Sequence, residues 1–282
     1  MFARARTRDL SASYPERTAA PLHQAFDIGF ALATPAVSRL FTLRQPGVAI
    51  RNASNFPPTN RILAALPPKA QRRLLSALAR VELPLGRVLY QSGTTSRQVY
   101  FPNDCLVSLV AVADRGSGLE VGLVGAEGMI GVPLALGVST SPVKAMVQGA
   151  GSAMRMSAAR FGRELERSRP LRREVDRCAY VAMATAMQVA VCNKEHLLQA
   201  RLARWLLMTR DRVGSDDFRF TQQFIALMLG VRRTGVTVAA GELQRRNLIR
   251  YSRGRVQILD GRRLRAASCS CYEVIRKLGT TR

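Results

Sequence analysis

The chain has 282 residues, 47% of them hydrophobic, so it can bury the cores of two ordinary domains, and no apolar run reaches the roughly 18 residues that a transmembrane helix needs. Its 43 Lys and Arg residues outnumber 19 Asp and Glu residues, for a formal net charge of +24. Because such a surplus repels itself unless a polyanion shares the charge, nucleic acid is the expected partner and an anionic membrane the second choice, although the Arg codons of a GC-rich genome would produce the same bias.

Residues 1–58 are expected to form a poorly ordered N-terminal extension. They contain six prolines and little sustained periodicity. The apolar stretch at 28–41 is interrupted by Pro35 and lies too far from the start for an ordinary secretory signal. The segment fits a functional arm and a start codon assigned too far upstream equally well.

Residues 59–168 are expected to form a sensor domain, an antiparallel β-roll preceded by short helices at 60–66 and 70–79. Behind these helices, short apolar segments rich in β-forming residues recur at a spacing of roughly ten residues, and turn residues such as Gly, Pro and Asp separate them. This spacing is typical of an antiparallel roll or barrel. The expected strands lie at 87–90, 98–101, 106–112, 119–123, 144–147 and 153–156.

Residues 169–196 are expected to form a dimerisation helix. Small, moderately apolar residues alternate there at spacings of four and three over about three heptads, which is the pattern of a helix–helix seam. The seam consists of Leu171, Val175, Cys178, Ala182, Thr185, Val189 and Cys192. The same pattern fits an amphipathic helix that packs on the roll of its own chain, and the sequence leaves both interpretations open.

Residues 197–282 are expected to form a DNA-binding domain. After a helix at 197–212, two short helices joined by a turn are predicted between Thr221 and Ile249. Thr221 is a good N-cap, and Gly230 stands where the turn demands a positive φ. The second helix has one apolar face at spacings of three and four, formed by Val236, Ala239, Ala240 and Leu243. Two helices with such a turn, the second basic at its start, are typical of the DNA-reading helix-turn-helix.

The opposite face of the second helix is expected to contact DNA bases and phosphates. A β-hairpin at 248–259 follows it, with a basic turn placed to touch the neighbouring phosphate backbone as a wing. The candidate DNA-binding residues are Thr221, Gln222, Arg232, Arg233, Thr234, Thr237 and Val238 in the helical pair, and Arg253 and Arg255 in the hairpin.

The chain resembles the CRP/FNR family of bacterial transcription regulators. The resemblance rests on LLQARLARWLLMTRDRVG at 197–214, LGVRRTGVTVAAGELQRRNLI at 229–249 and YSRGRVQILD at 251–260, and it extends over 59–282. It implies a cyclic-nucleotide-binding-like jelly roll that senses an unidentified small-molecule effector. It also implies a cytoplasmic homodimer that binds double-stranded DNA at a pseudo-palindromic promoter site and meets RNA polymerase there.

The reading helix departs from the pattern of the better-known family members. Arg233 occupies the position of the first base-contacting Arg, but Thr234 stands where the family has Glu, and Val238 stands where it has a second Arg. The family's usual base sequence is therefore not expected. Our hypothesis is that Arg233 reads guanine with two hydrogen bonds, while Val238 or Thr237 contacts a thymine methyl group.

The sensor domain lacks the usual grip on a cyclic nucleotide. The resemblance implies a Gly-Glu pair, a short helix and an Arg in the stretch at 121–149, where Gly125 and Glu127 are the nearest equivalent of the pair. Lys144 is the only cation there, and it is a point charge rather than a forked guanidinium. We expect no cyclic nucleotide to bind, and Gly125, Glu127 and Lys144 remain the candidate effector residues.

Neither a cofactor nor catalysis is expected. The five cysteines are odd in number and scattered, which fits reduced thiols in a cytosol, and Cys105 alone falls in the roll, which excludes an iron–sulfur sensor there. Cys269 and Cys271 form a C-x-C sequence, but without a second pair or a His no zinc site is expected, and His196 is expected to be structural. No catalytic motif is present. A basic RNA- or ribosome-associated protein is the alternative function, although no RNP-like aromatic motif is visible.

Overall fold

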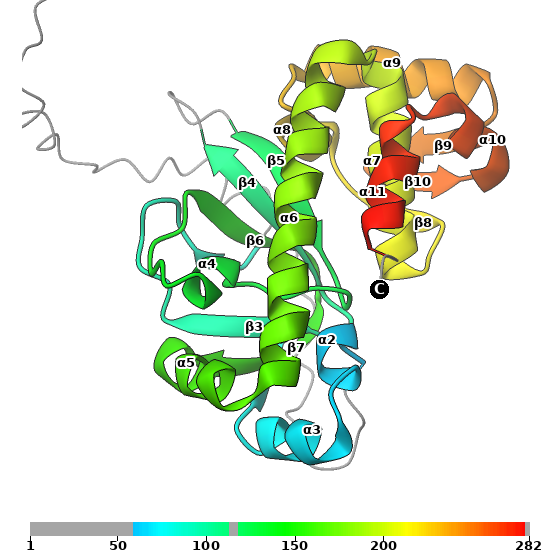
Figure 1. The fold of residues 1–282 in the computed structure, drawn as a ribbon. Helices are drawn as coiled ribbons and strands as arrows, with labels where there is room; N and C mark the ends of the chain where they lie inside the picture. Colours follow the sequence, from blue (N-terminus) through cyan, green and yellow to red (C-terminus); the bar gives the residue numbers. More distant parts are fainter. Residues whose placement is uncertain (1–58, 113–117, 280–282) are drawn as a thin grey trace, which may run out of the picture. The chain divides into compact units, whose positions relative to one another are not determined.

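The structure, a computed structural model, describes residues 59–112 and 118–279, so the extension predicted at 1–58 lies outside the described residues (Figure 1). Antiparallel sheets come first, then one long helix, and then a group of helices with a small sheet. The predicted α+β fold class, with roll, long helix and winged helix-turn-helix, is confirmed. All described residues belong to one compact unit.

The roll consists of two antiparallel sheets with the strand orders β1-β7-β3 and β2-β6-β4-β5. All six predicted strands are present within a few residues of their expected bounds. The strand β1 was not expected, because a helix was predicted over 70–79. In the structure this helix ends at Leu75, and the chain is already extended at Ala79. The strands are β1 (Ala79–Leu83), β2 (Val88–Tyr90), β3 (Gln98–Pro102), β4 (Leu106–Val112), β5 (Gly118–Val124), β6 (Val143–Gly149) and β7 (Gly151–Ser157). The helices are α2 (Arg61–Ala64), α3 (Pro68–Leu75), α4 (Val132–Ala135) and α5 (Ala158–Arg167).

Side chains alternate across the four-stranded sheet, as the pleat of a strand requires. Val107 and Val147 point into the roll and pack in its apolar core with Tyr100. Ser108 and Gln148, the next residues along, point to the other face and contact each other there. The roll therefore has an apolar interior, and the other face of this sheet carries buried polar residues.

The long helix α6 (Arg169–Glu195) packs the predicted dimer seam against its own chain. Leu171 and Val175 belong to the core that α6 shares with the roll and its helices. Two other seam residues, Cys178 and Ala182, are partly buried. The fully buried seam residues are Leu171, Val175, Thr185, Val189 and Cys192. These side chains have no exposed surface to offer a partner, so the alternative of an internal amphipathic helix describes this face.

A different stripe of α6 faces away from the chain. It consists of Tyr180, Met183, Met187 and Val191, at spacings of three and four, and more than half of each side chain is exposed. We refer to these four residues as the exposed stripe of α6. Large apolar side chains at helical spacing are costly to leave in water, so this stripe, rather than the predicted seam, is available to a partner.

The C-terminal part is built around α7 (Leu198–Val213), in which residues 201–209 are all buried. Trp205 anchors an aromatic cluster there, with its ring centroid 5.2 Å from that of Phe220. The other elements are β8 (Asp217–Arg219), α8 (Gln222–Leu229), α9 (Arg233–Arg245), β9 (Ile249–Ser252), β10 (Arg255–Ile258), α10 (Gly261–Ala267) and α11 (Cys271–Leu278), and the sheet order is β8-β10-β9. Within the described ranges, no single helix is long and apolar enough to cross a membrane.

Candidate nucleic-acid interface

The helices α8 and α9 form the predicted helix-turn-helix. They meet at a bend of 103°, inside the range of roughly 90–120° that this motif adopts. Thr221 caps α8, since its hydroxyl accepts a hydrogen bond from the backbone N–H of Phe224 at 3.1 Å. Gly230 ends α8 with a φ of +63°, and a Cβ there would lie 2.9 Å from Leu119 on β5. The positive φ thus favours glycine at this turn, and the tip of the Leu119 side chain packs closely against it.

The helix α9 has one buried and one exposed face. Its buried face is formed by Val236, Ala239, Ala240 and Leu243, which hold it against α7 and α8. Its exposed face brings together the predicted contact residues Arg232, Arg233, Thr234, Thr237 and Val238. Val238 is 72% exposed, which is unusual for a large apolar side chain on a helix that is otherwise well packed. This face can reach an external surface without any rearrangement of α9.

Gln222 connects the two helices on this face. Its Oε1 accepts a hydrogen bond from Thr237 Oγ1 at 2.9 Å and one from Arg233 Nε at 3.4 Å. The amide therefore orients two of the predicted base-reading side chains from the neighbouring helix. The role predicted for Gln222 itself was direct contact with DNA, and in the described structure its carbonyl oxygen is occupied.

The hairpin of β9 and β10 has the predicted basic turn. Arg253 and Gly254 adopt positive φ values of 48° and 78°, as the two central residues of a tight hairpin turn do, and Arg253 is exposed. Arg255 is also exposed, but its Nε donates to both carboxylate oxygens of Asp217 on β8, at 2.9 and 2.8 Å. This hydrogen bonding holds the pKa of Asp217 below its ordinary value. Of the two wing arginines, Arg255 is thus paired with Asp217, whereas Arg253 has no ion pair in the described structure.

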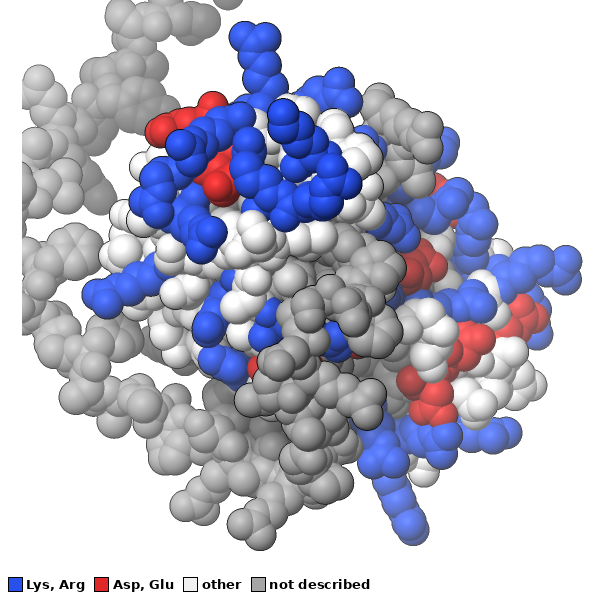
Figure 2. Space-filling view, turned by 90° about the horizontal axis from the view of Figure 1, so that it is seen from below, with Lys and Arg blue, Asp and Glu red and all other residues white. Residues whose placement is uncertain are grey.

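Positive charge is not confined to the helix-turn-helix. Figure 2 views the molecule from the end at which α3 and α5 lie in Figure 1, and Lys and Arg side chains cover much of that face with few acidic ones between them. The exposed basic residues of α3, α5 and the start of α6 are Lys69, Arg72, Arg73, Arg160, Arg163, Arg167, Arg169 and Arg173. Net charge alone therefore does not locate a binding surface, and what distinguishes the exposed face of α9 is its geometry.

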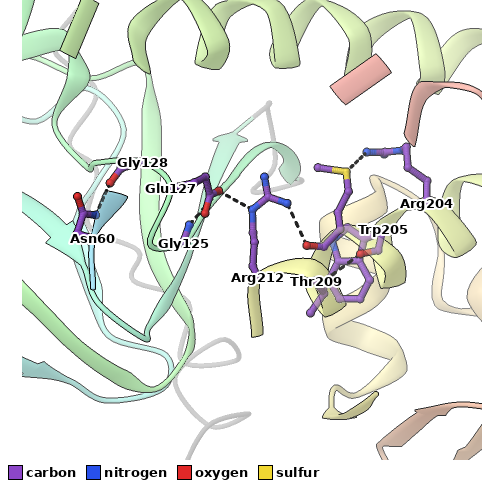
Figure 3. A network of polar contacts seen from close by, with 9 residues as sticks. Asn60, Gly125, Glu127, Gly128, Arg204, Trp205, Thr209 and Arg212 are labelled. Carbon is purple, nitrogen blue, oxygen red and sulfur yellow. Dashed lines mark hydrogen bonds and ion pairs between the residues drawn. The ribbon is translucent and has the colours of Figure 1, made fainter. Parts of the chain in front are cut away.

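Glu127, a candidate effector residue, instead holds α7 (Figure 3). Arg212 Nε donates to Glu127 Oε1 at 2.7 Å, and the backbone N–H of Gly125 donates to the same oxygen at 3.3 Å. A Cβ on Gly125 would lie 2.9 Å from the other carboxylate oxygen, so a side chain at this position would require the Glu127 carboxylate to shift. The predicted pair is thus brought together, but its partner is Arg212, a residue that sequence reasoning did not connect with it.

Lys144 does not join Gly125 and Glu127. It lies opposite Val110 in the sheet, and Val110 lies opposite Glu120 on β5. Gly125 follows the far end of β5, roughly 16 Å farther along at about 3.3 Å per residue. Burial lowers the pKa of Lys144. The three candidate effector residues therefore do not form a single site.

A buried carboxyl group joins the outer face of the roll to α7. Glu120 accepts hydrogen bonds from Ser108 Oγ at 2.7 Å and from Trp205 Nε1 at 3.0 Å. Burial raises the pKa of Glu120 to about 7, although these donors and the positive charge of Arg204 oppose the rise. Nothing in the sequence pattern singles out Glu120, because its partner Trp205 lies 85 residues farther along the chain.

Residues 200–267 match the family model of the Crp-like helix-turn-helix domain. This segment belongs to that domain family. The Crp-like domain runs from the start of α7 into the end of α10 and includes the exposed face of α9. No curated protein matches the chain.

Solved structures show where the Crp-like domain sits in a larger fold. FixK2 from Bradyrhizobium japonicum is 12% identical with a TM-score of 0.60, covering 68% of this chain and 98% of that one. The c-di-GMP-responsive global regulator CLP of Xanthomonas campestris is 17% identical with a TM-score of 0.59, covering 68% and 99%. TTHB099, a CRP-family transcriptional regulator from Thermus thermophilus, is 21% identical with a TM-score of 0.55, covering 67% and 96%. These likenesses establish the fold of the CRP/FNR regulators.

The fold also gives the C-x-C sequence two partners that lie just outside the Crp-like domain. Cys192 and His196 at the end of α6 come close to Cys269 and Cys271, and the four possible ligand atoms all lie within 4.8 Å of one another. The expectation of no zinc site rested on the lack of a second pair or a His. That reason is contradicted, because Cys192 and His196, far away in sequence, supply a third thiol and a His.

Proposed function

We propose that this protein is a sequence-specific transcription regulator that binds double-stranded DNA through α9. The observation that carries the proposal is the exposed face of α9, which combines arginines at its N-terminus with a 72% exposed Val238 on a helix whose other face is fully buried. The N-terminus of a helix favours phosphate, and its first turns reach base edges in the major groove. The domain divisions that we propose are 59–168 for the sensor, 169–196 for the linking helix and 197–282 for the DNA-binding domain.

The chemistry of the exposed face suggests how bases are read. Arg233 can donate two hydrogen bonds to guanine, and Gln222 already holds its side chain near Thr237. Val238 suits a thymine methyl group, since it offers only apolar contact. Arg232 and Arg253 are exposed cations that suit phosphates on either side.

Homodimerisation is proposed to occur through the exposed stripe of α6. A dimer related by a two-fold axis along α6 would present two copies of α9 to successive major grooves, about 34–36 Å apart. The operator would then be pseudo-palindromic, as expected from the sequence. In the cytoplasm such a dimer would act beside RNA polymerase at a promoter.

The sensor is proposed to act on DNA binding through α7. Glu120 and Glu127 on the roll hold Trp205 and Arg212 of α7, and α7 packs against α9. An effector that shifts β5 would therefore move the support of the reading helix. Since Glu127 is occupied by Arg212, we propose it as a coupling residue.

Fluorescence anisotropy with an operator selected from random DNA tests the proposal. Arg233→Ala should weaken operator binding by about 1–3 kcal/mol and relax the preference at one base pair. Arg245→Ala is the matched control, because Arg245 is exposed on the same helix but lies at its far end and pairs with Glu242. Equal losses for both variants, or tighter binding of single-stranded RNA than of the operator, would favour the RNA-binding alternative.

A further inference from the structure

Four possible metal ligands converge from both sides of the Crp-like domain. Cys192 and His196 are four residues apart at the C-terminal end of α6, and Cys269 and Cys271 come just before and at the start of α11. Cys192 Sγ lies 3.4 Å from Cys269 Sγ, and Cys271 Sγ lies 3.6 Å from His196 Nδ1. We propose that Cys192, His196, Cys269 and Cys271 bind a Zn²⁺ ion in a closed, structural site.

The distances among these atoms suit a single tetrahedral ion. Zinc binds thiolate sulfur at about 2.3 Å and histidine nitrogen at about 2.0 Å, so the edges of its coordination tetrahedron are about 3.8 Å between sulfurs and about 3.6 Å between sulfur and nitrogen. The separations of 3.4 Å and 3.6 Å fall within about 0.4 Å of these edges, and all pairs of ligand atoms lie within 4.8 Å. Three thiols and one imidazole are also donors that favour zinc, whereas magnesium and calcium prefer oxygen ligands.

Burial makes the site closed. Cys192, Cys269 and Cys271 are at most 6% exposed, and together they form a small cluster of their own, against which Ala200 packs. A zinc ion with four protein ligands needs no solvent position, which is the arrangement of structural rather than catalytic sites. The buried sulfurs also explain why Cys192 occupies a seam position on α6 without serving a partner helix.

Two buried guanidinium groups supply the electrostatic argument. Arg201 and Arg204 on α7 are 8% and 4% exposed, and the Nε of each lacks a hydrogen-bond partner in the described structure. Arg204 acts electrostatically on both Cys192 and Cys269. Three thiolates, one Zn²⁺ and a neutral imidazole carry a net charge of −1, which would help to compensate the positive charge of these two buried guanidinium groups.

The hydrogen bonds around the sulfurs also favour a metal site. Cys192 and Cys269 share a hydrogen bond in which either sulfur can be the donor, so these two sulfurs are close enough to bind one ion. Gln188 Nε2 donates to Cys271 Sγ at 3.1 Å. Such donors outside the ligand shell stabilise thiolate charge and orient the ligand.

The ion would join segments that lie 77 residues apart in the chain. It would fasten the start of α11 to the end of α6 and so close the Crp-like domain from both ends. Because a preformed site is absent in the unfolded chain, the binding energy of the metal becomes folding energy. The metal-free protein should therefore unfold at a lower temperature.

Metal analysis of the full chain, purified without chelators from zinc-supplemented cells, provides the test. We expect one zinc per chain in the wild type and loss of zinc in Cys269→Ser. Cys178→Ser should keep the zinc, because Cys178 lies on the same α6 but outside the cluster. Replacement by Co²⁺ should give the visible absorption of a tetrahedral site together with thiolate charge transfer in the near ultraviolet.

A second variant covers the case in which Cys269→Ser fails to fold. Cys271→His keeps four donors, so it should retain one metal ion while the cobalt charge-transfer absorbance falls to about two thirds, since two thiolates remain of three. Zinc well below one per chain in folded wild type would overturn the proposal, as would a Cys192–Cys269 disulfide in place of the metal. These readouts do not depend on DNA binding, so they can fail or succeed independently of the proposed function.

Discussion

The buried carboxyl of Glu120 makes stability depend on pH in a direction that can be worked out. Burial raises its pKa from an ordinary value of 4.5 to about 7, so the folded protein holds a proton that the unfolded chain releases. The stabilisation from this group is complete below pH 4.5 and is lost as the pH rises through about 7. A rise of this size corresponds to about 3 kcal/mol between the two limits.

The variant Glu120→Gln removes the titration while keeping an acceptor for Trp205. Urea unfolding at a pH of about 5 and again at about 8 measures the effect. We expect the wild type to lose about 2.5 kcal/mol more than the variant over this range, because every other titrating group is common to both proteins. The exposed Glu82→Gln on β1 is the matched control and should leave the wild-type slope unchanged. Equal slopes for wild type and Glu120→Gln would refute the raised pKa of Glu120.

Two further predictions concern α6 and the helix-turn-helix. Met187→Glu should dissociate the dimer in analytical ultracentrifugation with little loss of thermal stability. Val189→Glu should instead unfold the chain, since Val189 is 4% exposed. The reverse result would restore the seam predicted from sequence. Gly230→Ala should lower the free energy of unfolding by about 1–2 kcal/mol because of its positive φ. Gly241→Ala, with open space around it inside α9, should raise that free energy by about 0.5–1 kcal/mol, and the same sign for both variants would contradict the argument.

The helices and strands that were predicted correctly are those with a sequence pattern that spans only a few residues. The strands of the roll and the helices α8 and α9 follow from alternation, turn residues and a cap, all of which act within a few residues. The strands β1 and β8 were missed because local patterns do not reveal them. The strand β8, for example, is short and is defined by its pairing with β10 rather than by its own residues. Local pattern also separates the two faces of α9 correctly, since its apolar positions are consecutive in helical spacing.

The periodicity of α6 shows where such reasoning stops. A seam at spacings of four and three indicates that one face of a helix is covered, but it does not say by what. Here Val175 is covered by the core of the same chain, and Met187, outside the seam, is exposed. The distinction depends on how the roll and α11 fold back on α6, which is a tertiary property. The pairing of Arg255 with Asp217 is of the same kind, because strand pairing brings together residues 38 apart.

The helix α7 is where the long-range contacts meet. Trp205 and Arg212 reach the roll, whereas Arg204, one residue from Trp205, acts electrostatically both on Glu120 and on the sulfurs of Cys192 and Cys269. Because residues 201–209 are buried on all sides, a change in charge at either end has no solvent to absorb it. The helix α7 also packs against α9. A proton on Glu120 and a metal ion at the sulfurs would therefore act on the support of the reading helix through the same buried guanidinium, that of Arg204.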